Sequence, residues 1–304
     1  MNLVKQCSLL LALRRLPVAA ALVLSAVPAW ADSDDDAGKA ARVPSRDKSG
    51  YTLFNPTPRD AMREFSTDRP DQTESPFTVD AGHVQFEMDF AAFTQDRADG
   101  IRTRTWNVAP FNVRAGLLNH LELSLVFDSY LHARTEDRAG HTATTQSGVG
   151  DFTARLKLNL WGNDGGKTAF ALLPYVKFPT NSDHLGNRAV EGGLLLPLSI
   201  ELPAGFGVSL ETGASFVQND DDRAYHAEIV NSISIDHAIV GKLSGYVEFF
   251  SSVSTQRDQP WAGTVDAGLL FAVTENVQLD CGCNIGVSKG ADDVSPFVGI
   301  SVRF

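Results

Sequence analysis

Apolar and polar residues alternate with a period of two from residue 84 to the end of the chain. Successive side chains of a β-strand point to opposite faces, so each such run predicts a strand with one apolar and one polar face. The runs predict about twelve antiparallel strands, over 84–90, 101–116, 121–128, 152–160, 168–180, 190–202, 208–216, 225–235, 242–249, 261–271, 277–288 and 294–304.

Two strands fit the pattern less well. Within 101–116, Arg102, Arg104 and Trp106 do not keep a clean parity with their neighbours, which predicts a bulge. The strand over 168–180 is apolar on both faces and contains Pro174, so the pattern leaves its facing undecided.

Alternation alone does not say which face points inward. In a soluble β-sandwich or lipocalin-like barrel the apolar face forms the core, whereas in an outer-membrane barrel it faces lipid. Four features favour the second architecture. The final strand ends on Phe304, a secretory signal precedes the chain, aromatic residues lie near strand ends, and the connections alternate in length. The longer set includes a predicted loop over 134–148, and the short set lies on the side of both mature termini.

The fold class predicted is therefore all-β, an antiparallel transmembrane β-barrel of the outer-membrane type. The chain has 304 residues, 43% of them hydrophobic, and a formal charge of −11. No basic patch is available to neutralise phosphates, which argues against a nucleic-acid partner. Outside the N-terminus no apolar run approaches the roughly 18 residues of a membrane helix.

The N-terminal third divides into three parts. Residues 1–31 resemble a signal peptide, with basic residues, an apolar core and the cleavage site Ala29-Trp30-Ala31. Residues 32–64 are acidic and proline-containing, which predicts a disordered periplasmic leader. Residues 65–83 form a polar motif segment that precedes the barrel of 84–304. This segment is either an ordinary capped turn or a folded-in piece that seats against the periplasmic end of the barrel.

The polar faces of the strands carry the charges that would line the lumen. These candidate pore residues are Glu87, Asp89, Arg155, Lys157, Glu211, His226, Glu228, Lys242, Glu248, Asp266, Asp280 and Arg303. Such a mixture fits paired charges that fill the interior, and it fits the lining of a narrow pore equally well. His226 and Glu228 share a face and could act as an acid/base pair or simply hydrogen-bond.

Enzymatic chemistry is not indicated. A lipase-type barrel needs a serine two residues after a histidine on one strand face, and none of the seven histidines has one. Cys281 and Cys283 share a face, a poor geometry for a disulfide, and no ligand spacing predicts a metal. We expect no catalytic residue, no metal and no cofactor.

Several segments carry a family resemblance. The run Thr67-Asp68-Arg69-Pro70-Asp71-Gln72-Thr73-Glu74-Ser75-Pro76, followed by 82–87, resembles the opening signature of the outer-membrane transporter family labelled "putative MetA-pathway of phenol degradation". Further similar segments are 148–151, 172–180, 280–286 and 297–304, so the resemblance covers about residues 65–304. Asp80-Ala81 departs from it, since a proline is expected before the glycine.

The resemblance implies passive uptake of small, often aromatic, compounds. The alternative is a structural or surface-interaction barrel with a plugged lumen and no transport activity. The expected partners are outer-membrane lipids, a small-molecule solute and the barrel-assembly machinery, through the strand that ends in Phe304.

Overall fold

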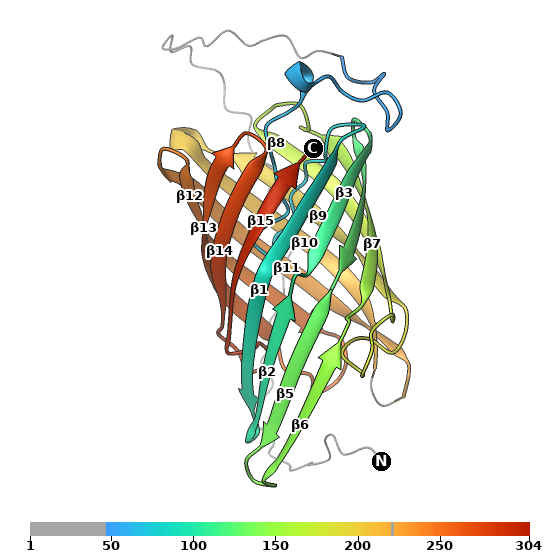
Figure 1. Cartoon of the computed structure of the whole chain (residues 1–304), viewed down its shortest axis with the longest axis vertical. Coiled ribbons are helices and arrows are strands. Elements are labelled where there is room, and N and C mark those ends of the chain that lie inside the picture. The colour runs from blue at the N-terminus through green and yellow to red at the C-terminus, as the bar shows by residue number, and fades with distance from the viewer. Residues whose placement is uncertain (1–46, 220–221) are drawn as a thin grey trace. The chain divides into compact units, whose positions relative to one another are not determined.

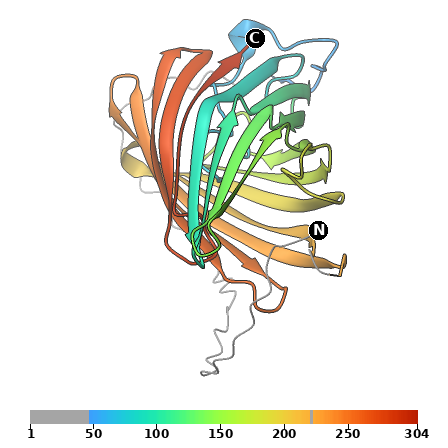
Figure 2. The same ribbon diagram turned by 60° about the horizontal axis from the view of Figure 1, so that its bottom comes forward.

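A computed structural model describes residues 47–219 and 222–304. The predicted signal peptide and the first part of the predicted leader, up to residue 46, lie outside the described residues. Among the described residues, fifteen strands form one antiparallel sheet. Strand β1 also pairs with β15, which closes the sheet into a barrel. Figures 1 and 2 show the strands around a common interior.

The fifteen strands make twelve passes around the barrel. The second, third and fourth passes are each interrupted once, between β2 and β3, β4 and β5, and β6 and β7. The bounds are β1 Val84–Ala98, β2 Ile101–Val108, β3 Phe111–Leu118, β4 Leu121–Phe127, β5 Tyr130–Asp137, β6 Thr142–Gly148, β7 Phe152–Trp161, β8 Thr168–Phe178, β9 Glu191–Glu201, β10 Phe206–Gln218, β11 Tyr225–Val240, β12 Leu243–Ser254, β13 Ala262–Thr274, β14 Val277–Gly286 and β15 Val294–Arg303. The predicted all-β class and closed twelve-stranded barrel are confirmed.

The predicted bulge in the second pass falls at Ala109 and Pro110. Ala109 has a φ of 53°, and Pro110 has no N–H to donate to the sheet, so the ladder breaks between β2 and β3. The expected loss of parity at Arg102, Arg104 and Trp106 is wrong, because β2 is regular and these side chains share a face.

The predicted loop over 134–148 is also wrong. Strands β5 and β6 pair through that region and turn only at 138–141. Its residues are mostly threonine, charged or small, so polar side chains alternate with polar side chains and the pattern gives no sign of a strand.

The apolar face of the barrel points outward. Exposed residues along the strands include Phe90, Leu156, Leu194, Ile229, Ile233, Val247, Leu269, Phe271, Leu279, Ile285 and Val298. The opposite face holds the fully buried Gln85, Glu87, Arg114, Glu122, Lys157, Glu248 and Asp266. This inversion of a soluble core is the pattern of a barrel immersed in lipid. Among the described residues, no helix is long and apolar enough to cross a membrane.

A charged side chain on the outward face should therefore lower the free energy of unfolding, and it should do so more near the middle of the lipid layer than near its edge. Leu269, near the middle of β13, is exposed, and Leu269→Arg should lower the free energy of unfolding from lipid vesicles by about 2–4 kcal/mol. The matched variant Val253→Arg, near the end of β12, should cost only about 0–1 kcal/mol. Equal costs measured by denaturant titration would contradict a lipid-facing belt.

Candidate functional site: a lumen occupied by residues 65–83

Residues 65–83, called the plug segment below, lie inside the barrel at the end where the connections are short. Figure 1 shows the segment in blue, entering the upper end of the ring of strands. Its backbone and side chains hydrogen-bond to residues of β1, β3, β4, β7, β10, β11, β12, β13 and β14. The segment therefore contacts most of the wall rather than one strand.

The innermost bend of the plug segment is held by Glu248 of β12. Its carboxylate accepts hydrogen bonds from the backbone N–H groups of Gln72 and Thr73, both at 2.8 Å. The Thr73 hydroxyl also lies 2.7 Å from Ser232 Oγ of β11. The side-chain amide of Gln72 donates to Asp266 of β13 at 2.7 Å. Wall carboxylates thus satisfy the N–H groups that a turn leaves unpaired.

Arg114 of β3 is the centre of a second cluster. Its guanidinium lies 2.8 Å from carboxylate oxygens of both Glu87 and Glu122, and 3.3 Å from Asp68 of the plug segment. It also donates to the Phe77 carbonyl at 2.9 Å. Arg114, Glu87 and Glu122 are completely buried. One cation therefore pairs with three carboxylates, and Lys157, 2.5 Å from Asp68, adds a second positive charge.

Arg69 anchors the segment to β14 and β1. Its guanidinium pairs with Asp280 of β14 at 2.5 Å and with Asp89 of β1 at 2.6 Å. It also lies over the ring of Phe297, 5.6 Å from the centroid. A Cβ at Gly299 would come within 2.3 Å of this guanidinium, so only glycine leaves room for it at that position.

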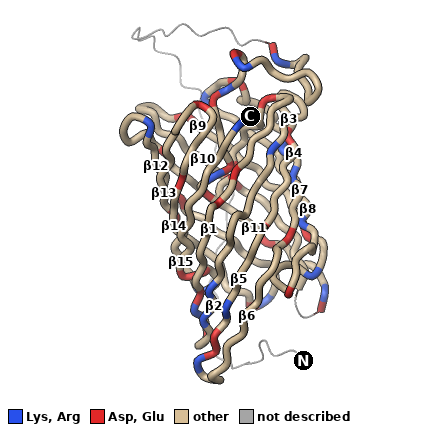
Figure 3. The backbone as a smooth tube through the Cα atoms, viewed as in Figure 1, with Lys and Arg blue, Asp and Glu red and all other residues tan. Residues whose placement is uncertain are grey.

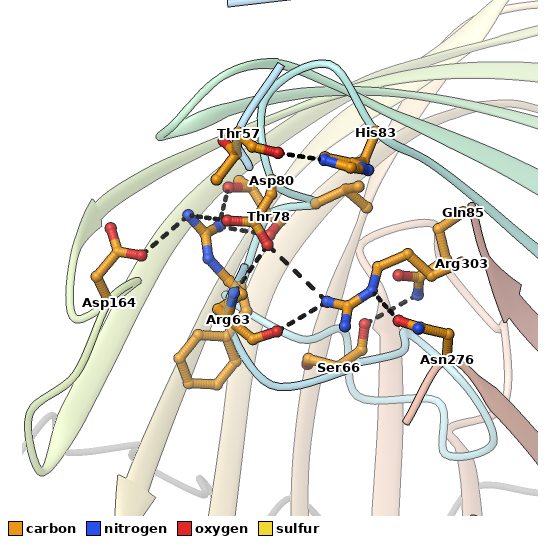
Figure 4. A network of polar contacts seen from close by, with 12 residues as sticks. Thr57, Arg63, Ser66, Thr78, Asp80, His83, Gln85, Asp164, Asn276 and Arg303 are labelled. Atoms are coloured by element: carbon orange, nitrogen blue, oxygen red, sulfur yellow. Dashed lines mark hydrogen bonds and ion pairs between the residues drawn. The ribbon is translucent and has the colours of Figure 1, made fainter. Parts of the chain in front are cut away.

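A third cluster closes the end of the barrel where the plug segment leaves it. Arg63 donates from its backbone N–H to Asp80 at 3.0 Å, and its guanidinium reaches Asp164 at 3.2 Å and Thr78. Arg303 of β15 donates to the Arg63 carbonyl at 2.9 Å. Figure 4 shows these residues bridging the plug segment to the rim.

Residues 47–64 also belong to this cluster. Lys48 pairs with Asp80 at 3.1 Å and with Asp164 at 2.7 Å, and the backbone N–H of Leu53 donates to the Leu117 carbonyl at 2.8 Å. The sequence predicts a disordered leader over 32–64, whereas the structure places residues 47–64 against the barrel rim through these contacts. The sequence gives these residues no apolar periodicity, because their contacts are polar ones to the barrel rim.

Two carboxyls three positions apart in the plug segment have opposite pKa shifts. Burial opposes ionisation of Asp68, yet the adjacent Arg114 and Lys157 keep its pKa below the usual range. Burial raises the pKa of Asp71 well above its usual range, and the neighbouring Glu248 carboxylate adds to this. Asp68 is therefore an ionic anchor, whereas burial and the nearby Glu248 disfavour the charged form of Asp71.

Most of the predicted pore residues meet the plug segment. Direct partners are Glu87, Asp89, Arg155, Lys157, Glu211, Glu248, Asp266 and Asp280. Arg303 lies at the rim with Arg63. His226, Glu228 and Lys242 are elsewhere. His226 and Glu228 are 3.6 Å apart near the long-connection end, and Lys242 donates to the Val273 carbonyl at the short-turn end.

Two completely buried charged residues of the wall, Arg114 and Glu122, were missing from the predicted pore set. Arg114 lies in the second pass, whose facing was obscured by the break at 109–110, and Glu122 begins a strand directly after a tight turn. The paired register Gly116↔Glu122 and Arg114↔Ser124 places both on the inner face. Strict alternation from Leu121 places Glu122 on the inner face. The facing of Arg114 can be predicted only when the position of the bulge is known.

The lumen on the other side of the plug segment holds small polar cavities. One of about 230 Å³ is lined by Gln72, Phe250, Thr264, Asn284 and Asp292, among others. A second of about 290 Å³ lies against β1 and β2, and Asp292 also lines it. In residues 47–219 and 222–304 no cluster of His, Cys, Asp and Glu is arranged to hold a metal ion, and Cys281 and Cys283 are free.

The chain is similar in fold to known outer-membrane barrels. An outer membrane channel from Pseudomonas putida F1 superposes with a TM-score of 0.56 at 14% identity, over 79% of this chain and 100% of that chain. The NanC porin covers 73% of this chain and 100% of its own, with a TM-score of 0.47 at 10% identity. No curated protein matches the sequence. A family model matches residues 67–304, and the chain thus belongs to the family described as "Putative MetA-pathway of phenol degradation".

Proposed function

We propose that this protein is a non-enzymatic outer-membrane channel for passive uptake of small compounds, aromatic ones included, and that the plug segment closes its lumen at rest. The observation that carries the proposal is a polar lumen in which charged wall residues pair with a chain segment that enters from one end, in addition to the wall pairs that Arg114 makes with Glu87 and Glu122. Arg69, Asp68 and Gln72 supply partners for wall residues on opposite sides of the barrel.

The membership in a phenol-degradation family supports aromatic compounds as the solute class. The cavities beyond the plug segment have volumes that admit a single six-membered ring, and Phe250 offers one aromatic surface among polar neighbours. Small ligand sites combine an apolar surface with a few polar groups in this way.

The orientation we propose puts the short turns, the plug segment and residues 47 and 304 in the periplasm. Bacterial barrels have short periplasmic turns and longer extracellular loops. Here the turns 119–120, 241–242 and 275–276 lie at one end, and the connections 179–190, 255–261 and 287–293 at the other. A solute would then meet the cavities first and the plug segment afterwards.

A gate is favoured over a permanent filling by the kind of contact involved. The plug segment is joined to the wall by hydrogen bonds and ion pairs, which exchange with water at a net cost of about 0.5–1.5 kcal/mol for each neutral bond and about 1.5–3 kcal/mol for each bond to a charged group. A barrel closed for structural reasons alone is better served by apolar packing, because a buried ion pair adds little stability over well-packed hydrophobic residues.

The proposal is tested by flux into proteoliposomes that contain the folded protein. Benzenesulfonate and trimethylphenylammonium are suitable because their permanent charges keep them from crossing the lipid. We expect both to enter faster than glucose, and the cation to enter fastest, since Asp96 and Asp292 line the outer cavities.

Empty vesicles provide the baseline for this measurement. A heat-modifiable, correctly inserted barrel that admits all three solutes no faster than empty vesicles would contradict the uptake proposal. That result would support the alternative, a structural barrel with a permanently closed lumen.

A further inference from the structure

The second and third passes, together with β6, extend the wall at the long-connection end. Strand β2 pairs with the outer half of β1 and with β5, and β5 pairs with β6. The outward face of this extension begins with Phe93 and Trp106, whose rings are 4.8 Å apart, and Trp106 is exposed. Exposed Trp side chains mark the level of the lipid headgroups on a membrane barrel.

Directly beyond these rings the same face turns basic. In the register of the sheet, Arg104 lies opposite Arg134, and in the next row Arg102 lies between Arg97 and Glu136. Each of these residues has the parity of Trp106 and therefore points outward. Figure 3 shows the blue basic positions along the lower part of this extension.

Three of the four arginines converge on a single acid. Glu136 accepts from Arg102 at 3.0 Å, from Arg104 at 2.7 Å and from Arg134 at 2.9 Å. Arg97 lies 4.0 Å from Asp293 at the edge of the group. A guanidinium has five N–H donors and a carboxylate about four acceptor sites, so most of the donors of this cluster are not used by Glu136.

The arrangement costs stability in the isolated protein. Like charges placed directly opposite one another on neighbouring strands repel, and Arg104 and Arg134 form such a pair. Arg134 is also half exposed, at 52% of its side-chain surface. An anion that bound between Arg104 and Arg134 would relieve this repulsion. Phosphate is suited to the position, because arginine binds phosphate with two parallel hydrogen bonds.

We propose that Arg97, Arg102, Arg104 and Arg134, called the outer arginine cluster, bind the phosphate groups of an anionic glycolipid of the lipid A type in the outer leaflet. The occupant is a lipid rather than a soluble anion because the cluster adjoins the exposed ring of Trp106 on the lipid-facing surface. Acyl chains can lie over Phe93 and Trp106 while the headgroup phosphates reach the arginines. This inference rests on the orientation given under Proposed function, but it does not depend on transport.

The test uses native mass spectrometry of the purified barrel in a non-ionic detergent, titrated with bisphosphorylated lipid A. We expect Arg102→Gln/Arg104→Gln/Arg134→Gln to weaken binding by at least about 30-fold, because each charged hydrogen bond contributes about tenfold or more. A barrel with Arg188→Gln/Arg223→Gln/Arg257→Gln loses the same charge from loops at the same end. It should bind as the unmodified protein does.

A second variant separates binding from folding. Glu136→Gln removes the acid that the three arginines share, so it should tighten lipid A binding by a few-fold, which a misfolded barrel would not do. Binding of dephosphorylated lipid A should be weak to every variant. Unchanged affinity in the triple arginine variant, equal losses in the loop control, or weaker binding by Glu136→Gln would each overturn the proposal. Flux through the lumen is a separate readout, so failure here leaves the channel proposal intact.

Discussion

Replacing Arg114 with methionine is expected to lower the free energy of unfolding by about 3–5 kcal/mol and to release the plug segment from the wall. The side chain is completely buried between Glu87 and Glu122, and it also reaches Asp68 and the Phe77 carbonyl. Removing it leaves carboxylates without a counter-charge in a site that excludes water. The cost is that of uncompensated charge rather than of the lost contacts alone.

Two measurements check this result. Denaturant unfolding in vesicles, followed by tryptophan fluorescence, gives the change in stability, and limited proteolysis reports whether residues 65–83 become cleavable. Arg138→Met, in the exposed turn between β5 and β6, is the matched control and should behave like the unmodified protein. Arg114→Lys should fall between the two, because it keeps the charge but not the paired hydrogen bonds. A stability loss below about 1 kcal/mol for Arg114→Met would contradict the role of this cluster.

The barrel itself could be predicted from the sequence because its signal is local. Alternation places every second side chain on one face, and lipid requires that face to be apolar, so strands such as 206–218 and 277–286 are readable from their own residues. The pairing of the last strand with the first also follows, since an open edge in lipid would leave backbone groups unsatisfied. The structure confirms that pairing, with Glu87 opposite Ser301.

The contents of the lumen could not be predicted in the same way. Asp68, Arg69 and Gln72 have ordinary turn composition, and the partners that hold them, such as Lys157, Asp280 and Asp266, come from strands about 90 to 210 positions further along. A polar strand face can contact water, another polar face across the lumen or a chain segment that folds into the lumen. Alternation does not distinguish these three cases. The extension over β5 and β6 was missed for a related reason, because both of its faces are polar.

The second large effect concerns movement of the plug segment. The hydroxyls of Thr73 and Ser232 lie 2.7 Å apart, one on the plug segment and one on β11, so cysteines at both positions should form a disulfide. Thr73→Cys/Ser232→Cys would be placed in a Cys281→Ala/Cys283→Ala background, since both native thiols are free. If solutes pass only when the segment shifts, the oxidised protein should admit none and the reduced protein should recover flux.

The matched control ties the segment to itself instead of to the wall. Ser66 and Ser75 are both in the plug segment with their hydroxyls 3.0 Å apart, so Ser66→Cys/Ser75→Cys adds a bond of the same kind without fixing the segment to a strand. Both variants should show the same heat-modifiability, which reports an intact barrel. The internal bond should leave most of the flux.

The most direct measurement of the account is therefore the ratio of trimethylphenylammonium flux in reduced and oxidised Thr73→Cys/Ser232→Cys, set against the same ratio for the Ser66→Cys/Ser75→Cys control. A gate made by residues 65–83 predicts at least about a tenfold ratio for the wall-linked protein and a ratio near one for the control. Equal flux before and after oxidation, with the disulfide shown to be complete, would mean that solutes do not need the plug segment to move.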